Sequence, residues 1–87
     1  MSQASPLSSP IKRQTLAEQV AGAIRESILL GDLEPGAGLP TEAELAAQLG
    51  VSRSVVRDAT RILMAQGLVD VQHGKGVFVT GSQTEAF

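Results

Sequence analysis

The sequence predicts a small α+β domain that is mainly helical, with three helices followed by a β-hairpin. Two apolar-patterned helices are separated only by Gly50, Val51 and a capping serine, and the second carries three arginines on one face. Two alternating segments then flank Gly74-Lys75-Gly76. This is the order of elements in a winged helix-turn-helix, which places its second motif helix in the DNA major groove.

The first helix is expected from about residue 16 to residue 30. Thr15 and Glu18 have the spacing of a capping box, and apolar residues recur every fourth position from Leu16. Gly31 is expected to end the helix because glycine adopts the left-handed conformation readily. Residues 32–38 contain Pro35-Gly36, which predicts a turn.

The second helix is expected over residues 42–49, after a second capping box formed by Thr41 and Glu44. We interpret Glu42 and Glu44 as helix N-terminal carboxylates and not as a catalytic pair. Gly50 ends this helix, and Ser52 is a candidate N-cap for the next one. So short a connection makes the two helices cross steeply, as in a helix-turn-helix.

The third helix is expected over about residues 53–66, and it is strongly two-sided. At 100° per residue, Arg53, Arg57 and Arg61 fall within roughly 80° of one another, opposite the apolar residues. Arg53 and Arg57 lie early in the helix, where base contacts usually originate. Arg61 lies two turns in, where simple solvation explains an arginine equally well.

The hairpin is expected from residues 69–73 and 77–80, which alternate around the glycine-rich tip. His73, Gly74 and Lys75 could form only a polar turn. At a wing tip, however, the glycine allows close approach while histidine and lysine supply donors, which favours minor-groove or phosphate contact.

The formal net charge of −2 conceals an uneven distribution. The first 51 residues carry three basic and six acidic side chains, whereas residues 52–75 carry four basic and two acidic ones. Phosphate attraction depends on this local distribution more than on the total charge. The sequence therefore predicts a basic surface made of the third helix and the hairpin.

The chain of 87 residues is long enough for one small domain, which we place at residues 14–80. Residues 1–13 are predicted to be a disordered tail, and residues 81–87 a C-terminal tail or the start of a linker. The chain has no cysteine, which excludes disulfides and thiolate metal sites and favours the cytoplasm. No apolar run suits a membrane span, and no pattern indicates catalysis, a metal site or a cofactor.

Several runs together closely resemble the GntR family of bacterial transcription regulators over residues 15–80. They are Leu39-Pro40-Thr41-Glu42-Ala43-Glu44-Leu45-Ala46, Leu49-Gly50-Val51-Ser52-Arg53-Ser54-Val55-Val56-Arg57-Asp58-Ala59 and Gly74-Lys75-Gly76-Val77-Phe78-Val79, after a matching start in residues 28–36. The stretch Val56–Ala59 and the His-Gly wing are most similar to the FadR-type branch.

The resemblance implies a regulator, most often a repressor, that binds palindromic operator DNA as a homodimer. It implies that a small-molecule effector binds an absent C-terminal domain, so that this fragment alone is a monomer. It also implies DNA contact by Ser52, Arg53, Ser54 and Arg57, and minor-groove contact by His73 and Gly74. Ala43 departs from the family, which usually has a DNA-contacting arginine at that position.

These observations predict sequence-specific binding of double-stranded DNA, with residues 53–66 in the major groove and residues 73–76 in the minor groove. The predicted DNA-binding residues are Ser52, Arg53, Ser54, Arg57, Arg61, His73, Gly74 and Lys75. The alternative is a winged helix that binds another protein and not DNA. An RNA-binding winged helix is disfavoured because the two aromatic residues offer little for base stacking.

Overall fold

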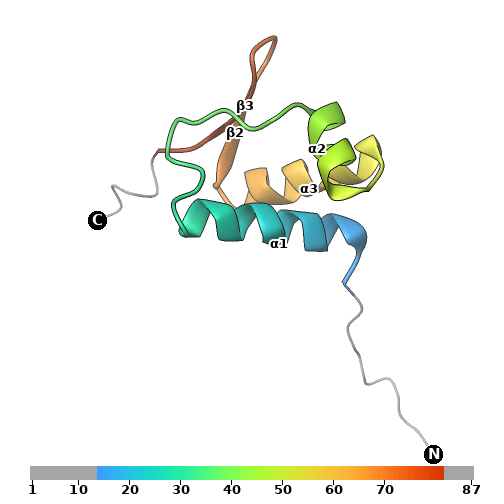
Figure 1. Ribbon diagram of the computed structural model, residues 1–87. Coiled ribbons are helices and arrows are strands. Elements are labelled where there is room, and N and C mark those ends of the chain that lie inside the picture. Colours follow the sequence, from blue (N-terminus) through green and yellow to red (C-terminus); the bar gives the residue numbers. More distant parts are fainter. Residues whose placement is uncertain (1–13, 82–87) are drawn as a thin grey trace, which may run out of the picture.

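The computed structural model describes residues 14–81, which form three helices and a two-stranded antiparallel hairpin (Figure 1). The helices are α1 (Leu16–Leu29), α2 (Glu42–Leu49) and α3 (Arg53–Ala65), and the strands are β2 (Val69–Gln72) and β3 (Gly76–Val79). The predicted fold class is therefore confirmed. The predictions for residues 1–13 and 82–87 lie outside the described residues.

Both predicted capping boxes are present. The Thr15 hydroxyl accepts a hydrogen bond from the Glu18 N–H (3.1 Å), and the Glu18 carboxylate accepts one from the Thr15 N–H (2.9 Å). Thr41 and Glu44 repeat the arrangement at α2, with distances of 3.0 and 2.8 Å. Local sequence chemistry alone therefore fixes where these two helices begin.

The corner between α2 and α3 is formed by the residues that the sequence indicated. Gly50 caps α2 in the left-handed conformation, with φ of 70°, and its N–H donates to the Ala46 carbonyl. Ser52 caps α3, and its hydroxyl accepts a hydrogen bond from the Val55 N–H at 3.2 Å. These caps fix the angle at which α3 leaves α2.

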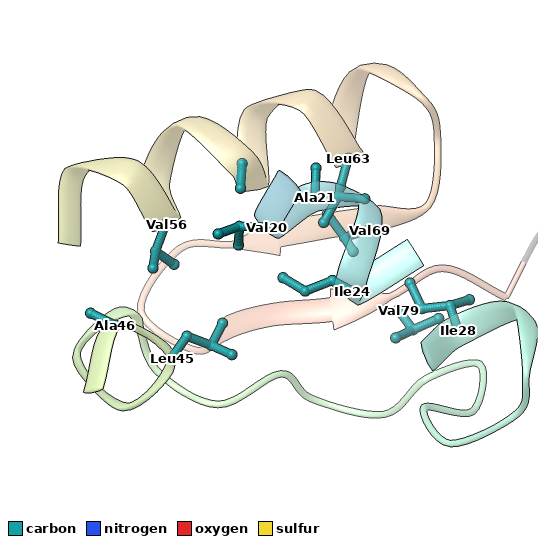
Figure 2. Close-up of a cluster of buried hydrophobic side chains, with 11 residues drawn as sticks. Val20, Ala21, Ile24, Ile28, Leu45, Ala46, Val56, Leu63, Val69 and Val79 are labelled. Atoms are coloured by element: carbon teal, nitrogen blue, oxygen red, sulfur yellow. The ribbon is translucent and has the colours of Figure 1, made fainter. Parts of the chain in front are cut away.

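The core lies between the three helices and the hairpin (Figure 2). Helix α3 contributes Val56, Ala59 and Leu63, which are at most 1% exposed. The remaining core residues come from α1, α2 and the two strands: Val20, Ala21, Ile24, Ile28, Leu45, Ala46, Val69 and Val79. Because its opposite side is fully buried, α3 presents one fixed face to solvent.

The hairpin projects away from the helices (Figure 1). Its strands pair with Val69 opposite Val79 and Gln72 opposite Gly76. The strands end and begin one residue earlier than predicted, because Lys75 N–H bonds to the Gln72 carbonyl and closes a turn over residues 73–75. His73 therefore lies in the turn and not at the end of a strand.

The segment of residues 36–39, which starts in the turn at Gly36, lies along β3 and was expected only as part of a turn and its exit. Gly36 N–H and Leu39 N–H donate to the carbonyls of Val79 and Val77, while Val79 N–H donates to the Ala37 carbonyl. The distances are 2.8–2.9 Å. This segment covers the otherwise open edge of β3 and fixes the wing to the rest of the domain.

Candidate nucleic-acid interface

The arginine face of α3 lies opposite the core, as predicted. Arg53, Arg57 and Arg61 are all exposed, whereas the buried residues of the helix occupy the other side. The burial of one side prevents the helix from turning about its axis. The structure therefore brings the three arginines onto one stable surface.

The two serines at the start of α3 are exposed, and both hydroxyls have a neighbour within hydrogen-bonding distance. The hydroxyl of Ser52 already accepts the capping bond from Val55, and it lies 3.2 Å from the hydroxyl of Ser54. Ser52 therefore has a structural role in addition to its predicted contact with DNA, whereas the hydroxyl of Ser54 can turn toward a ligand without uncapping the helix.

Arg57 is held by a residue that the sequence analysis did not place at the interface. Its Nε and Nη2 donate to Glu42 Oε2 and Oε1, both at 3.0 Å, which forms a bidentate ion pair between α3 and the first residue of α2. The Arg57 side chain is 52% exposed and the Glu42 side chain 32% exposed. Such fork geometry is directional as well as attractive.

The other two arginines differ in whether their side chains already have an ionic partner. Arg61 Nη1 donates to Asp58 Oδ1 at 3.0 Å, one turn earlier on the same helix, and both side chains are well exposed. Within residues 14–81, Arg53 has no hydrogen-bonded or ionic partner. Arg53 is therefore available to a polyanion without breaking an existing contact.

The carboxylate of Glu42 lies within the field of the whole arginine face. Its hydrogen bond with Arg57 is the largest cause that lowers its pKa below the usual 4.5, and the charges of Arg57, Arg53 and Arg61 act in the same direction. The same hydrogen bond raises the pKa of Arg57. At neutral pH both groups therefore carry their charges.

This lowered pKa gives a testable pH dependence. A carboxyl with a depressed folded-state pKa contributes stability above its unfolded pKa and loses that contribution as the pH falls through the folded value. We expect an NMR titration of the Glu42 side-chain carboxyl to show a midpoint below 4.5. In Arg57→Ala the midpoint should move upward, and an unchanged midpoint would contradict the assigned cause.

The wing and α3 border a common hollow of about 610 Å³. Its wall includes Arg57 and Arg61 from α3, Glu42 from α2, and Asp70 and His73 from the hairpin. Its apolar lining includes Leu39, Leu45, Val56, Met64, Val71 and Val77. The structure thus brings His73 to the same concave surface as Arg57 and Arg61, two of the predicted DNA-binding residues, whereas Arg53 and Lys75 lie outside its lining.

The tip residues of the wing are shaped for close approach. Gly74 has φ of 77°, a conformation that side-chain-bearing residues rarely adopt, and open space surrounds the position of a Cβ there. His73 and Lys75 flank it and are exposed. Within the described part of the chain, neither side chain has a hydrogen-bonded or ionic partner.

Three further observations concern the described residues. No three histidine or acidic side chains among residues 14–81 lie close enough to hold a metal ion. No helix in the same part of the chain is long and apolar enough to cross a membrane. Ala43, the second residue of α2, is exposed and offers no polar group to a ligand.

Comparison with known proteins gives a consistent result. Residues 16–79 match the family model described as bacterial regulatory proteins, gntR family. The chain is 45% identical over 65 residues to the transcriptional regulator Mce2R of Mycobacterium tuberculosis, and 45% identical over 64 residues to MngR of Escherichia coli, a repressor of a mannosyl-D-glycerate transport and metabolism system. These alignments cover 75% and 74% of this chain but only 27% of each relative.

Solved structures include the same fold on DNA. The DNA-binding domain of AraR in complex with operator ORE1 is 39% identical, with a TM-score of 0.76 over 86% of this chain and 90% of that one. The same domain with operator ORR3 gives a TM-score of 0.75 at 37% identity, over 90% of this chain and 93% of that one.

Proposed function

This chain belongs to the gntR family of bacterial regulatory proteins, and we propose that it is the operator-reading domain of a transcription regulator. Its helix α3 would lie in the major groove of double-stranded DNA and its wing in the adjacent minor groove. The observation that carries the proposal is the arginine face of α3, held in place by the buried opposite face. The operator complexes of AraR support it by analogy of fold.

The predicted contact residues then take distinct roles. Arg53 and Arg57 lie nearest the start of α3 and read base edges, because arginine donates bidentately to guanine. Arg61 and Ser54 contact phosphates, which position the helix without reading sequence. His73 and Gly74 approach the minor groove, and Lys75 neutralises a phosphate.

The remaining proposals concern regulators as long as the relatives that the chain matches. The chain spans about a quarter of the length of those relatives. We propose that such a protein binds a palindromic operator as a homodimer, since a twofold-symmetric protein matches a twofold-symmetric site. An effector-binding region outside this chain would control DNA binding, and the whole regulator would act in the cytoplasm, most often as a repressor. This chain would be monomeric on its own.

A titration of the ¹⁵N-labelled chain with a random-sequence duplex at low salt tests DNA binding directly. We expect amide shifts concentrated in α3 and in residues 73–75. Shifts on another surface, or none at low salt, would refute the proposal and favour a winged helix that binds protein.

Lys75→Ala isolates the phosphate contact of the wing. Loss of one neutralised phosphate should weaken binding to all duplexes similarly and reduce the slope of log K against log salt by about 0.9. Lys75→Arg keeps the charge and should preserve the slope. The measurement is the duplex affinity at several salt concentrations, and an unchanged slope in Lys75→Ala would remove Lys75 from the interface.

A further inference from the structure

Glu42 is an acidic residue on a surface proposed to face a polyanion, and neither of two ordinary explanations accounts for it. A carboxylate there repels phosphates, so it cannot promote DNA affinity by attraction. Its partner Arg57 is 52% exposed, and ion pairs this exposed contribute little to stability. The contact with Arg57 therefore leaves room for a role beyond the one Glu42 has as a carboxylate at the start of α2.

The geometry of the pair supplies that role. A guanidinium has five N–H donors, and Glu42 accepts hydrogen bonds from the single donor on Nε and from one of the two on Nη2. Three donors remain, on Nη1 and Nη2, which is the end of the guanidinium that can form a two-point contact with guanine O6 and N7. Glu42 thus occupies the side of the guanidinium and leaves its reading end free.

The backbone that carries Glu42 is itself fixed. It is the first residue of α2, directly after the N-cap Thr41, whose capping box with Glu44 uses the neighbouring side chains and leaves the carboxylate of Glu42 available. The arginine that it holds projects from a helix whose opposite face is fully buried. Both ends of the contact are therefore anchored to rigid elements.

We propose that Glu42 is a specificity-determining positioning residue: it restrains Arg57 to read one base pair and prevents it from turning to a phosphate. This inference rests on the proposed function. A restrained arginine loses less conformational freedom when it reads a base, and the carboxylate beside it disfavours a phosphate in the same place. Removal of the restraint should therefore increase general affinity while it reduces discrimination.

The test compares Glu42→Gln with Asp58→Asn in the full 87-residue chain. Each variant removes one negative charge beside an arginine of α3, but only the first breaks the bidentate ion pair of Arg57, because Asp58 pairs with Arg61. The probes are the duplex that the parent chain enriches most from a randomised library, its single-base variants, and an unrelated duplex of the same length.

In Glu42→Gln we expect binding to the unrelated duplex to strengthen and discrimination to fall by about five- to tenfold, concentrated at a single base pair. Asp58→Asn should strengthen general binding without loss at that base pair. In an Arg57→Ala background, Glu42→Gln should have no further effect on discrimination, because Glu42 acts through Arg57. Circular dichroism melting curves check that each variant remains folded.

Three results would overturn the inference. One is a Glu42→Gln variant that, like Asp58→Asn, binds all duplexes more tightly and keeps its discrimination between bases. Another is a loss of discrimination on Glu42→Gln that also occurs in the Arg57→Ala background. The third is a gain in affinity on Glu42→Gln that is larger for the selected duplex than for the unrelated one, which would make Glu42 an inhibitor of base reading by Arg57. If the parent chain enriches no sequence at all, the proposed function fails instead.

Discussion

Leu63→Ala is expected to lower the free energy of unfolding by about 2–5 kcal/mol, the usual range for a large apolar side chain truncated in a core. Leu63 is completely buried in the cluster where α3 packs against α1 and β2 (Figure 2). A core in a domain this small rarely supplies more than about 3–5 kcal/mol of net stability. The variant should therefore be partly or largely unfolded at 25 °C.

The measurement is urea unfolding followed by far-ultraviolet circular dichroism, because the chain has no tryptophan or tyrosine to report by fluorescence. Leu29→Ala is the matched control, since the same truncation occurs in α1 at a side chain that is 74% exposed. Its effect should stay within about 0.5 kcal/mol. Equal destabilisation by the two variants would contradict the described core.

The start of each helix could be predicted from the sequence because local chemistry decides it. Thr15 with Glu18, and Thr41 with Glu44, form capping boxes in the structure with the bonds that their spacing indicated. The opposition of arginines and apolar residues on α3 is equally local, since it follows from the helical period. The boundaries of the hairpin and helix ends shifted by only one residue.

The pairing of residues 36–39 with β3 could not be predicted, for a physical reason. Its bonds join backbone groups about forty residues apart, and the segment Gly36-Ala37-Gly38-Leu39 has no alternation that predicts a strand. The pairing depends on how α1 and the hairpin each pack against α3. Only the three-dimensional fold brings these groups within reach.

Glu42 was missed for a related reason. Its position before Glu44 gave it a satisfactory local interpretation as a helix N-terminal carboxylate, and that interpretation is compatible with the structure. The ion pair with Arg57 depends on the short corner between α2 and α3, which brings the first residue of one helix to the fifth of the other. The corner itself was predictable, and a search for opposite charges across it would have found the pair.

Arg57→Ala is expected to weaken binding to the parent-selected duplex by roughly 5- to 150-fold and to relax discrimination at one base pair. The reason is the loss of a two-point donor to guanine, for which alanine offers no substitute. Fluorescence-anisotropy titrations with the selected duplex and its single-base variants measure both effects. If Arg57→Ala binds the selected duplex and its single-base variants with the affinities of the parent, Arg57 does not contact a base.

Part of this loss should come from Glu42, because removal of Arg57 leaves an unpaired carboxylate facing the phosphates. The affinity lost on substitution by alanine includes the cost of leaving such a partner group unpaired. Two comparisons separate the contributions. Arg57→Lys keeps the positive charge but lacks the planar fork, so it should retain binding to an unrelated duplex and lose discrimination. Arg57→Ala combined with Glu42→Gln should recover general affinity without recovering discrimination, and a recovery of both would mean that Arg57 contributes charge alone.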